Sequence, residues 1–108
     1  MYKRQNAHGT GTVLNDAMEE TALAAVVPGA PVSSTKGATG HTLGAAGTLE
    51  AVFAVLALRD GVLPPNTGLS RATSGLDLVR SARSARPSVT MSVNFAFGGH
   101  NTALVFGR

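Results

Sequence analysis

The fold of this chain is decided by one stretch, residues 32–47, which reads VSSTKGATGHTLGAAG. The pattern predicts a short strand over Pro31 to Ser34, a glycine-punctuated turn, and a long apolar helix over residues 42–58. Lys36 and His41 lie at the junction. A histidine at a helix entrance lies near the positive end of the helix dipole, which favours the neutral ring. Neutral imidazole both donates and accepts hydrogen bonds, so it can polarise a carbonyl without carrying charge.

Length and composition limit the chain to one domain or a piece of one, because it has 108 residues, 44% of them hydrophobic. It has no cysteine, which excludes disulfides, cysteine-ligated metals and a thiol nucleophile within this chain. The net charge is +3, and the late arginines are Arg71, Arg80, Arg83 and Arg86. Aromatic residues interleaved with these arginines, as is typical of nucleic-acid binding, are missing, so no nucleic-acid partner is expected. We expect the arginines to lie in a solvated loop or to attract an acidic protein.

The only long apolar segment, Thr42 to Leu58, is short for a membrane span and carries Glu50 near its middle. It is therefore interpreted as a buried helix and not as a membrane anchor. No hydrophobic run follows the basic residues 1–5, so no signal peptide is expected and the expected compartment is the cytoplasm.

A second helix is predicted from Asn15 or Asp16 to about Val27, with Glu19 placed as in a capping box. Its apolar positions on one face are Leu23, Val26 and Val27. Residues 66–87 are mostly irregular, and strands over 89–95 and 102–106 form an antiparallel hairpin through a glycine pair. The order β-α-β-α-β-β predicts an α/β sheet with at least one right-handed crossover.

Each of the three histidines, His8, His41 and His100, stands beside a glycine. No pair has the spacing of metal ligands on a helix, so no metal site is predicted. The glycine-rich turn at 37–47 also favours an anion- or nucleotide-binding module, although it matches neither a P-loop nor a dinucleotide fingerprint.

Three ordered motifs together resemble the C-terminal portion of a β-ketoacyl-acyl-carrier-protein synthase, a ketosynthase of the thiolase superfamily. They are residues 8–12 (HGTGT) with Asp16 and Glu19, residues 33–41 (SSTKGATGH) with 43–47 (LGAAG) and Glu50, and residues 94–101 (NFAFGGHN). The resemblance spans roughly residues 6–107. It implies an acyltransferase of fatty-acid or polyketide synthesis that condenses malonyl carrier protein with an acyl thioester.

The resemblance implies that His8 and His41 donate hydrogen bonds to the malonyl thioester carbonyl, whose oxygen gains charge during decarboxylation. Lys36 then supports the histidines through Glu50. A buried structural ion pair is an equal alternative for these two residues. Glu19 matches a supporting carboxylate of the first motif.

By the same resemblance, Thr10 and Thr12 hydrogen-bond the phosphopantetheine arm of the carrier protein. Phe97 gates the acyl pocket, and its backbone N–H is one of two oxyanion donors; ordinary hairpin packing is the alternative. The family usually has Asn-Ser where this chain has Val93-Asn94, and threonine where it has His100.

The implied partners are acyl carrier protein, malonyl and acyl thioesters, and a cysteine-bearing ketosynthase half or dimer partner. No bound cofactor is expected, because the substrates are carried on phosphopantetheine. Lacking the cysteine, this chain alone is not expected to catalyse condensation. The alternatives are a non-catalytic partner that completes or regulates another ketosynthase chain, and the anion-binding module.

The implied fold is a partial thiolase-like fold, a single incomplete C-terminal domain over residues 1–108. The family's sheet order is 3-2-1-4-5, and we expect this chain to begin near the end of the second strand, with the central first strand absent. Residues 1–5 are an atypical, polar start. An apolar helix without its covering layers is expected to expose an aggregation-prone surface.

Overall fold

The computed structural model describes residues 3–70 and 74–108, so residues 1–2 of the atypical start and Arg71 lie outside the described residues. The fold contains strands, three α-helices and one 3₁₀ turn within these ranges. The elements are β1 Lys3–Asn6, α1 Val13–Val26, β2 Pro31–Ser33, α2 Lys36–Thr39, η1 Leu43–Ala45 (the 3₁₀ turn), α3 Ala46–Asp60, β3 Val62–Leu63, β4 Asp77–Leu78, β5 Arg83–Ser84, β6 Val89–Ala96 and β7 His100–Gly107.

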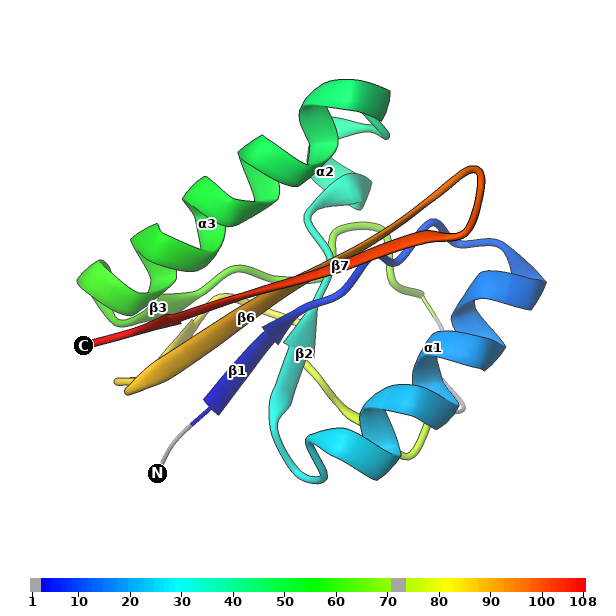
Figure 1. Cartoon of the computed structure of the whole chain (residues 1–108). Coiled ribbons are helices and arrows are strands. Elements are labelled where there is room, and N and C mark those ends of the chain that lie inside the picture. Colours follow the sequence, from blue (N-terminus) through cyan, green and yellow to red (C-terminus); the bar gives the residue numbers. More distant parts are fainter. Residues whose placement is uncertain (1–2, 71–73) are drawn as a thin grey trace.

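Five strands form the main sheet in the order β4-β2-β1-β6-β7. β1 runs parallel to both β2 and β6, and β6 pairs antiparallel with β7 along its whole length. The helices α1 and α3 lie on opposite faces of this sheet (Figure 1). The predicted α/β class and the C-terminal hairpin are therefore confirmed.

The polar run Lys3–Asn6, expected only as the end of a strand, lies in the middle of the described sheet, with Gln5 opposite both Val32 and Met91. The absence of the family's first strand stays a prediction. Gln5 and Asn6 are buried, although their sequence shows no apolar alternation. A neighbour on each side satisfies the backbone of β1, and this tertiary context outweighs weak strand propensity.

Helix α1 begins three or four residues earlier than expected. Thr12, in extended conformation, is the N-cap, and neither Asn15 nor Asp16 holds that position. The capping box is also wrong, because the Glu19 carboxylate accepts hydrogen bonds from the loop before the helix. Of the predicted inner positions Leu23 is buried, whereas Val26 is exposed. Leu23 packs with Ala7, Val32 and their neighbours into the core between α1 and the sheet.

The long apolar helix begins later than expected, at Ala46, because α2 and the 3₁₀ turn η1 occupy the glycine-rich turn. Its inner face is lined by small residues such as Ala54 and Ala57, which let α3 approach β6 closely. Thr90 on β6 donates a hydrogen bond from Oγ1 to the Ala54 carbonyl at 3.1 Å. The helix ends at Gly61, whose φ of +68° suits glycine.

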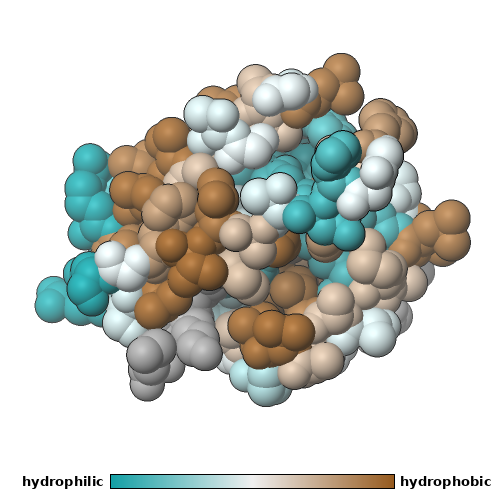
Figure 2. Space-filling model, in the orientation of Figure 1, coloured by the Kyte–Doolittle hydropathy of each residue, from teal (hydrophilic) through white to brown (hydrophobic). Residues whose placement is uncertain are grey.

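The expected burial of α3 holds for one face only. Leu49, Val52 and Val55 are exposed, Val52 by 48% of its surface. Apolar residues gather on the side of the molecule where α3 lies (Figure 2). The expectation that this helix exposes an apolar surface is thus confirmed for the described residues.

The segment between α3 and β6 is largely irregular, as predicted, but it carries three short strands. β3 pairs with β5 in a separate two-stranded sheet, and β4 extends the main sheet beside β2. Arg83 pairs with Asp77 at 2.7 Å, while Arg80 and Arg86 are exposed. Within the described part of the chain, no helix has both the length and the apolar character needed to cross a bilayer.

Candidate active site at the ends of β1 and β2

His8 follows the end of the central strand β1, where the chain leaves the sheet, and is 6% exposed. The carboxylate of Glu19 on α1 accepts hydrogen bonds from the backbone N–H groups of His8 and Gly9, at 2.6 Å and 2.8 Å. Gly9 has φ +47°, and a Cβ there would lie 2.4 Å from that of Ser34. Glu19 and the absence of a side chain at position 9 therefore fix the course of the backbone at His8.

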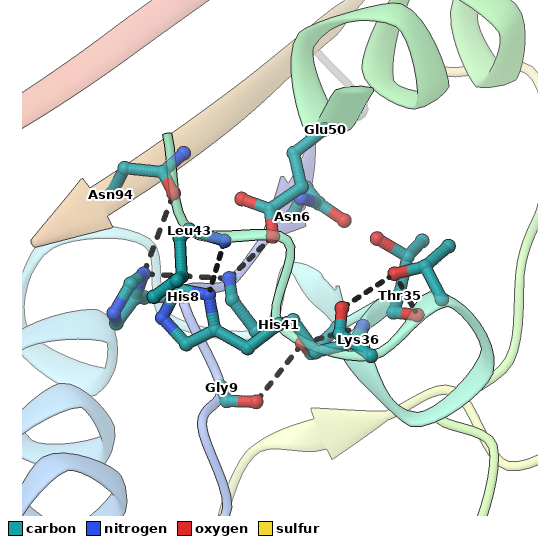
Figure 3. A network of polar contacts seen from close by, with 12 residues as sticks. Asn6, His8, Gly9, Thr35, Lys36, His41, Leu43, Glu50 and Asn94 are labelled. Carbon is teal, nitrogen blue, oxygen red and sulfur yellow. Dashed lines mark hydrogen bonds and ion pairs between the residues drawn. The ribbon is translucent and has the colours of Figure 1, made fainter. Parts of the chain in front are cut away.

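The imidazole of His8 lies among side chains of α2, of β6 and of the loop before η1, namely Lys36, Asn94 and His41 (Figure 3). Its Nδ1 is 3.4 Å from Lys36 Nζ and 3.4 Å from Asn94 Oδ1. The pKa of His8 is lowered from 6.5, first because burial disfavours the charged ring and second because the Lys36 ammonium repels it. His8 is therefore neutral near pH 7.

Lys36 comes from the first residue of α2 and Glu50 from the second turn of α3, and their side chains form a buried ion pair. The close approach of α2 to the loop that follows β3 depends on Gly37, where a Cβ would lie 1.9 Å from the Thr67 carbonyl oxygen. The structure brings the predicted pair together beside His8, so both interpretations of the pair are compatible with its position.

His41 meets His8 in an edge-to-face contact with ring centroids 5.6 Å apart. The dipole argument for His41 is wrong, because α3 begins five residues further on and His41 lies instead before the 3₁₀ turn. Its Nδ1 accepts a hydrogen bond from the Leu43 N–H at 3.2 Å, which leaves the proton on Nε2. Leu43 adopts φ +50°, a strained conformation for leucine that keeps this N–H on the ring.

The other predicted residues lie at the edge of this cluster. Thr10 and Thr12 are joined by a 3.0 Å hydrogen bond between their hydroxyls, in an exposed loop. Phe97 is 96% exposed in the β6–β7 turn, so the alternative of ordinary hairpin packing is wrong for this side chain. The phenylalanine in contact with His8 is Phe95, with ring centroids 5.4 Å apart.

A cavity of about 490 Å³ opens beside the cluster, between α1, the end of β2 and the loop that follows Pro65. Thr10, Ser34, Lys36 and His41 line its polar side, and Leu23 and Val32 are among its apolar residues. His8 and Phe97 do not line it. Among the described residues, no group of three or more His, Cys, Asp or Glu is placed to hold a metal ion.

Two residues in contact with His8 were assigned no role from the sequence. Asn94 and Phe95 come from β6, at the far end of the chain from His8. The one sequence feature that pointed to Asn94 is its difference from the serine usual in the family. Nothing in the sequence indicated that Asn94 lies against His8.

Comparison with known proteins identifies the family of this chain. The family described as β-ketoacyl synthase, C-terminal domain, matches residues 4–70. The chain is 44% identical over 110 residues to 3-oxoacyl-[acyl-carrier-protein] synthase 2 of Coxiella burnetii, covering 95% of this chain. A crystal structure of a β-ketoacyl synthase from Burkholderia phymatum superposes with a TM-score of 0.94 at 39% identity over 99% of this chain. The chain therefore belongs to the β-ketoacyl synthase family, as a C-terminal domain with a partial thiolase-like fold.

The chain spans only about a quarter of the length of these relatives, 27% of the Coxiella enzyme and 28% of the Burkholderia structure. A ketosynthase from Xenorhabdus doucetiae, solved in complex with its chain length factor, is also similar, with a TM-score of 0.82 and 42% identity over 96% of this chain. The present chain covers only 28% of the length of that ketosynthase as well.

Proposed function

We propose that this chain supplies the two-histidine part of a 3-oxoacyl-acyl-carrier-protein synthase. In that site malonyl carrier protein loses carbon dioxide, and the enolate formed attacks an acyl thioester. The observation that carries the proposal is the meeting of His8 and His41 in edge-to-face contact, although they come from different elements.

Decarboxylation breaks the bond between the carboxylate and the α-carbon, and the electron pair moves toward the thioester carbonyl. The oxygen of that carbonyl gains negative charge, which preorganised N–H donors stabilise. His41 keeps its proton on Nε2 because Nδ1 accepts from Leu43. Burial and the nearby Lys36 cation lower the pKa of His8, so its ring can donate a hydrogen bond without carrying charge.

Thr10, Thr12 and Phe97 are proposed to act on the substrate arm, the threonines on phosphopantetheine and Phe97 at the acyl pocket. Their exposure at the rim of the cluster supports access from solvent, where a carrier protein would deliver its thioester. Glu19 and the Lys36–Glu50 pair are proposed to hold the histidines in place.

The chain has no cysteine, so the acyl-bearing nucleophile has to come from another segment or another chain. The exposed apolar face of α3, at Leu49, Val52 and Val55, offers a surface for that partner. We propose that the active species is this chain joined to a cysteine-bearing ketosynthase half in the cytoplasm, and that the chain alone does not condense.

The test measures carbon dioxide release from malonyl carrier protein by the chain mixed with the cysteine-bearing segment of its Coxiella relative. We expect release and 3-oxoacyl product from the mixture, and loss of both with His41→Ala. His100→Ala is the matched control, because His100 is an exposed histidine at the start of β7. Release that is unaffected by both His8→Ala and His41→Ala would contradict the proposal.

A non-catalytic role as a partner of another ketosynthase chain is a second candidate. It is favoured by the similarity to a ketosynthase solved with its chain length factor. In that case the chain binds the cysteine-bearing segment, and turnover does not depend on His8 or His41. The anion-binding alternative has less support, because the ammonium of Lys36 is paired with Glu50; tight phosphate binding without carrier protein would favour it.

A further inference from the structure

One nitrogen of His8 faces two neighbours with opposite requirements. Lys36 Nζ and Asn94 Oδ1 both lie 3.4 Å from Nδ1 (Figure 3). An ammonium can only donate a hydrogen bond, and a side-chain carbonyl can only accept one. Nδ1 therefore satisfies Lys36 when it carries a lone pair and Asn94 when it carries a proton.

In the neutral ring the contact with Lys36 decides where the proton lies. The ammonium is buried with Glu50, so a second N–H dipole pointed at it would be repelled, whereas a lone pair is attracted. The neutral ring then keeps its proton on Nε2. When the ring takes up a second proton, Nδ1–H faces the Asn94 carbonyl and forms a charge-assisted hydrogen bond.

The position of Asn94 is set by strand pairing. It lies near the end of β6, opposite Thr102 of β7, and its amide nitrogen points toward Gly47 of α3, where a Cβ would lie 3.8 Å away. Such a Cβ would make only an ordinary van der Waals contact with the amide, so Asn94 packs against α3 without a clash.

We propose that Asn94 is a positioning residue for His8, accepting from Nδ1 in the charged ring, while Lys36 fixes the proton on Nε2 in the neutral ring. The catalytic meaning of this arrangement rests on the proposed function, because only the Nε2–H form donates to a carbonyl from that nitrogen. The Asn94 carbonyl stabilises the charged ring of His8, whereas the Lys36 ammonium destabilises it.

The charged and titratable groups that face His8 come from each element packed around it. They are Lys36 on α2, Glu50 on α3, Glu19 on α1, and the neighbouring ring of His41. Burial and then Lys36 lower the pKa of His8, and the hydrogen bond to Asn94, followed by Glu19 and Glu50, raises it. The test therefore changes Asn94 alone and keeps every charge.

The experiment follows the ring nitrogens of His8 by NMR on ¹⁵N-histidine-labelled chain, with His41→Ala and His100→Ala used for assignment. We expect neutral wild-type His8 to carry its proton on Nε2. Asn94→Ala should move the His8 titration midpoint to lower pH, and Asn94→Ser, which keeps an acceptor, should move it less. Thr102→Ala, which removes a polar group from the strand position opposite, should leave the midpoint unchanged.

If neutral His8 of the wild-type chain carries its proton on Nδ1, the inference is overturned, whatever the variants show. A midpoint that stays in place or rises with Asn94→Ala would overturn it as well. No carrier protein enters these measurements, so they separate this inference from the proposed function. Carbon dioxide release that depends on His8, together with an unchanged midpoint in Asn94→Ala, would contradict the inference alone.

Discussion

The ammonium of Lys36 and the carboxylate of Glu50 form an ion pair in which the two side chains are only 5% and 3% exposed. The second carboxylate oxygen of Glu50 has no hydrogen-bond partner among the described residues. The pair joins α2 to α3 beside His8 and so couples the folding of the two helices to the geometry of the histidine. Neither residue tolerates the loss of the other, because the remaining charge would be buried alone.

We expect Lys36→Met to destabilise the chain by about 3–5 kcal/mol, the usual cost of leaving one member of a buried pair uncompensated. The double variant Lys36→Met/Glu50→Leu should recover much of this loss, because it removes both charges. Urea unfolding followed by circular dichroism measures both. A double variant as unstable as the single one would contradict this account of the pair.

The pH dependence of stability should carry a contribution from His8. Its pKa in the folded chain is lowered from 6.5, chiefly by burial and then by Lys36. Above pH 6.5 His8 is mostly neutral in both the folded and the unfolded chain, so its titration contributes nothing to the pH dependence of stability. As pH falls through 6.5 toward the lower folded pKa, the unfolded chain binds the proton more readily, so stability is lost.

The measurement compares urea midpoints at about pH 7.5 and about pH 5.5 in wild type and His8→Gln. The variant should lose part of the decline, while His100→Gln, at an exposed position, should keep it. Asp60, whose pKa is lowered from 3.8, acts only in more acidic solution. An equal decline in all three proteins would show that other groups cause it.

Gly37 and Gly44 belong to the same glycine-rich stretch but should respond differently to alanine. A Cβ at Gly37 would lie 1.9 Å from the Thr67 carbonyl oxygen, whereas one at Gly44 meets nothing within 4 Å. Gly37→Ala should cost roughly 1–3 kcal/mol, because backbone must move to admit the methyl group. Gly44→Ala should be neutral or slightly stabilising. Similar thermal midpoints for the two variants would contradict the close approach.

The sequence predicted the parts of this fold that depend on local pattern. The hairpin after Ser88 alternates in strand fashion, and the apolar run before Asp60 could only be a helix. The strand end before His8 was expected, but its central place was not, because Lys3–Asn6 carries no apolar signal and its position is set by pairing with β2 and β6. The start of α3 was misplaced because helix propensity does not distinguish an α-helix from the 3₁₀ turn before it.

The candidate site was predicted through motif resemblance, and the resemblance grouped His8, His41, Lys36 and Glu50 correctly in space. The contacts it missed are those set by tertiary packing. Asn94 and Phe95 reach His8 only because β6 lies beside β1 in the sheet. For Glu19 the resemblance implied a supporting role and the capping-box pattern a helix cap; its carboxylate accepts a hydrogen bond from the backbone N–H of His8.

Glu19→Ala should therefore disturb His8 more than it disturbs α1. It removes the acceptor for two backbone N–H groups, one of them the buried N–H of His8, at a cost of about 1–3 kcal/mol. Glu20→Ala is the matched control, because Glu20 accepts a single exposed hydrogen bond from Gly75. Backbone amide exchange at His8 and Gly9 should speed up in the first variant only. Unchanged exchange there would contradict the role of Glu19.

The exposed face of α3 should govern how the chain associates. Val52 and Val13 are both exposed valines, but Val52 lies within an apolar helix face and Val13 stands at the start of α1. Val52→Lys should reduce self-association in sedimentation experiments and weaken capture of a cysteine-bearing ketosynthase half, because a charge would enter an apolar contact. Val13→Lys adds the same charge and should change neither. Because both side chains project into solvent, neither substitution should lower the thermal midpoint, which separates an effect on association from an effect on folding. Equal association by the two variants would mean that the partner binds elsewhere than on α3.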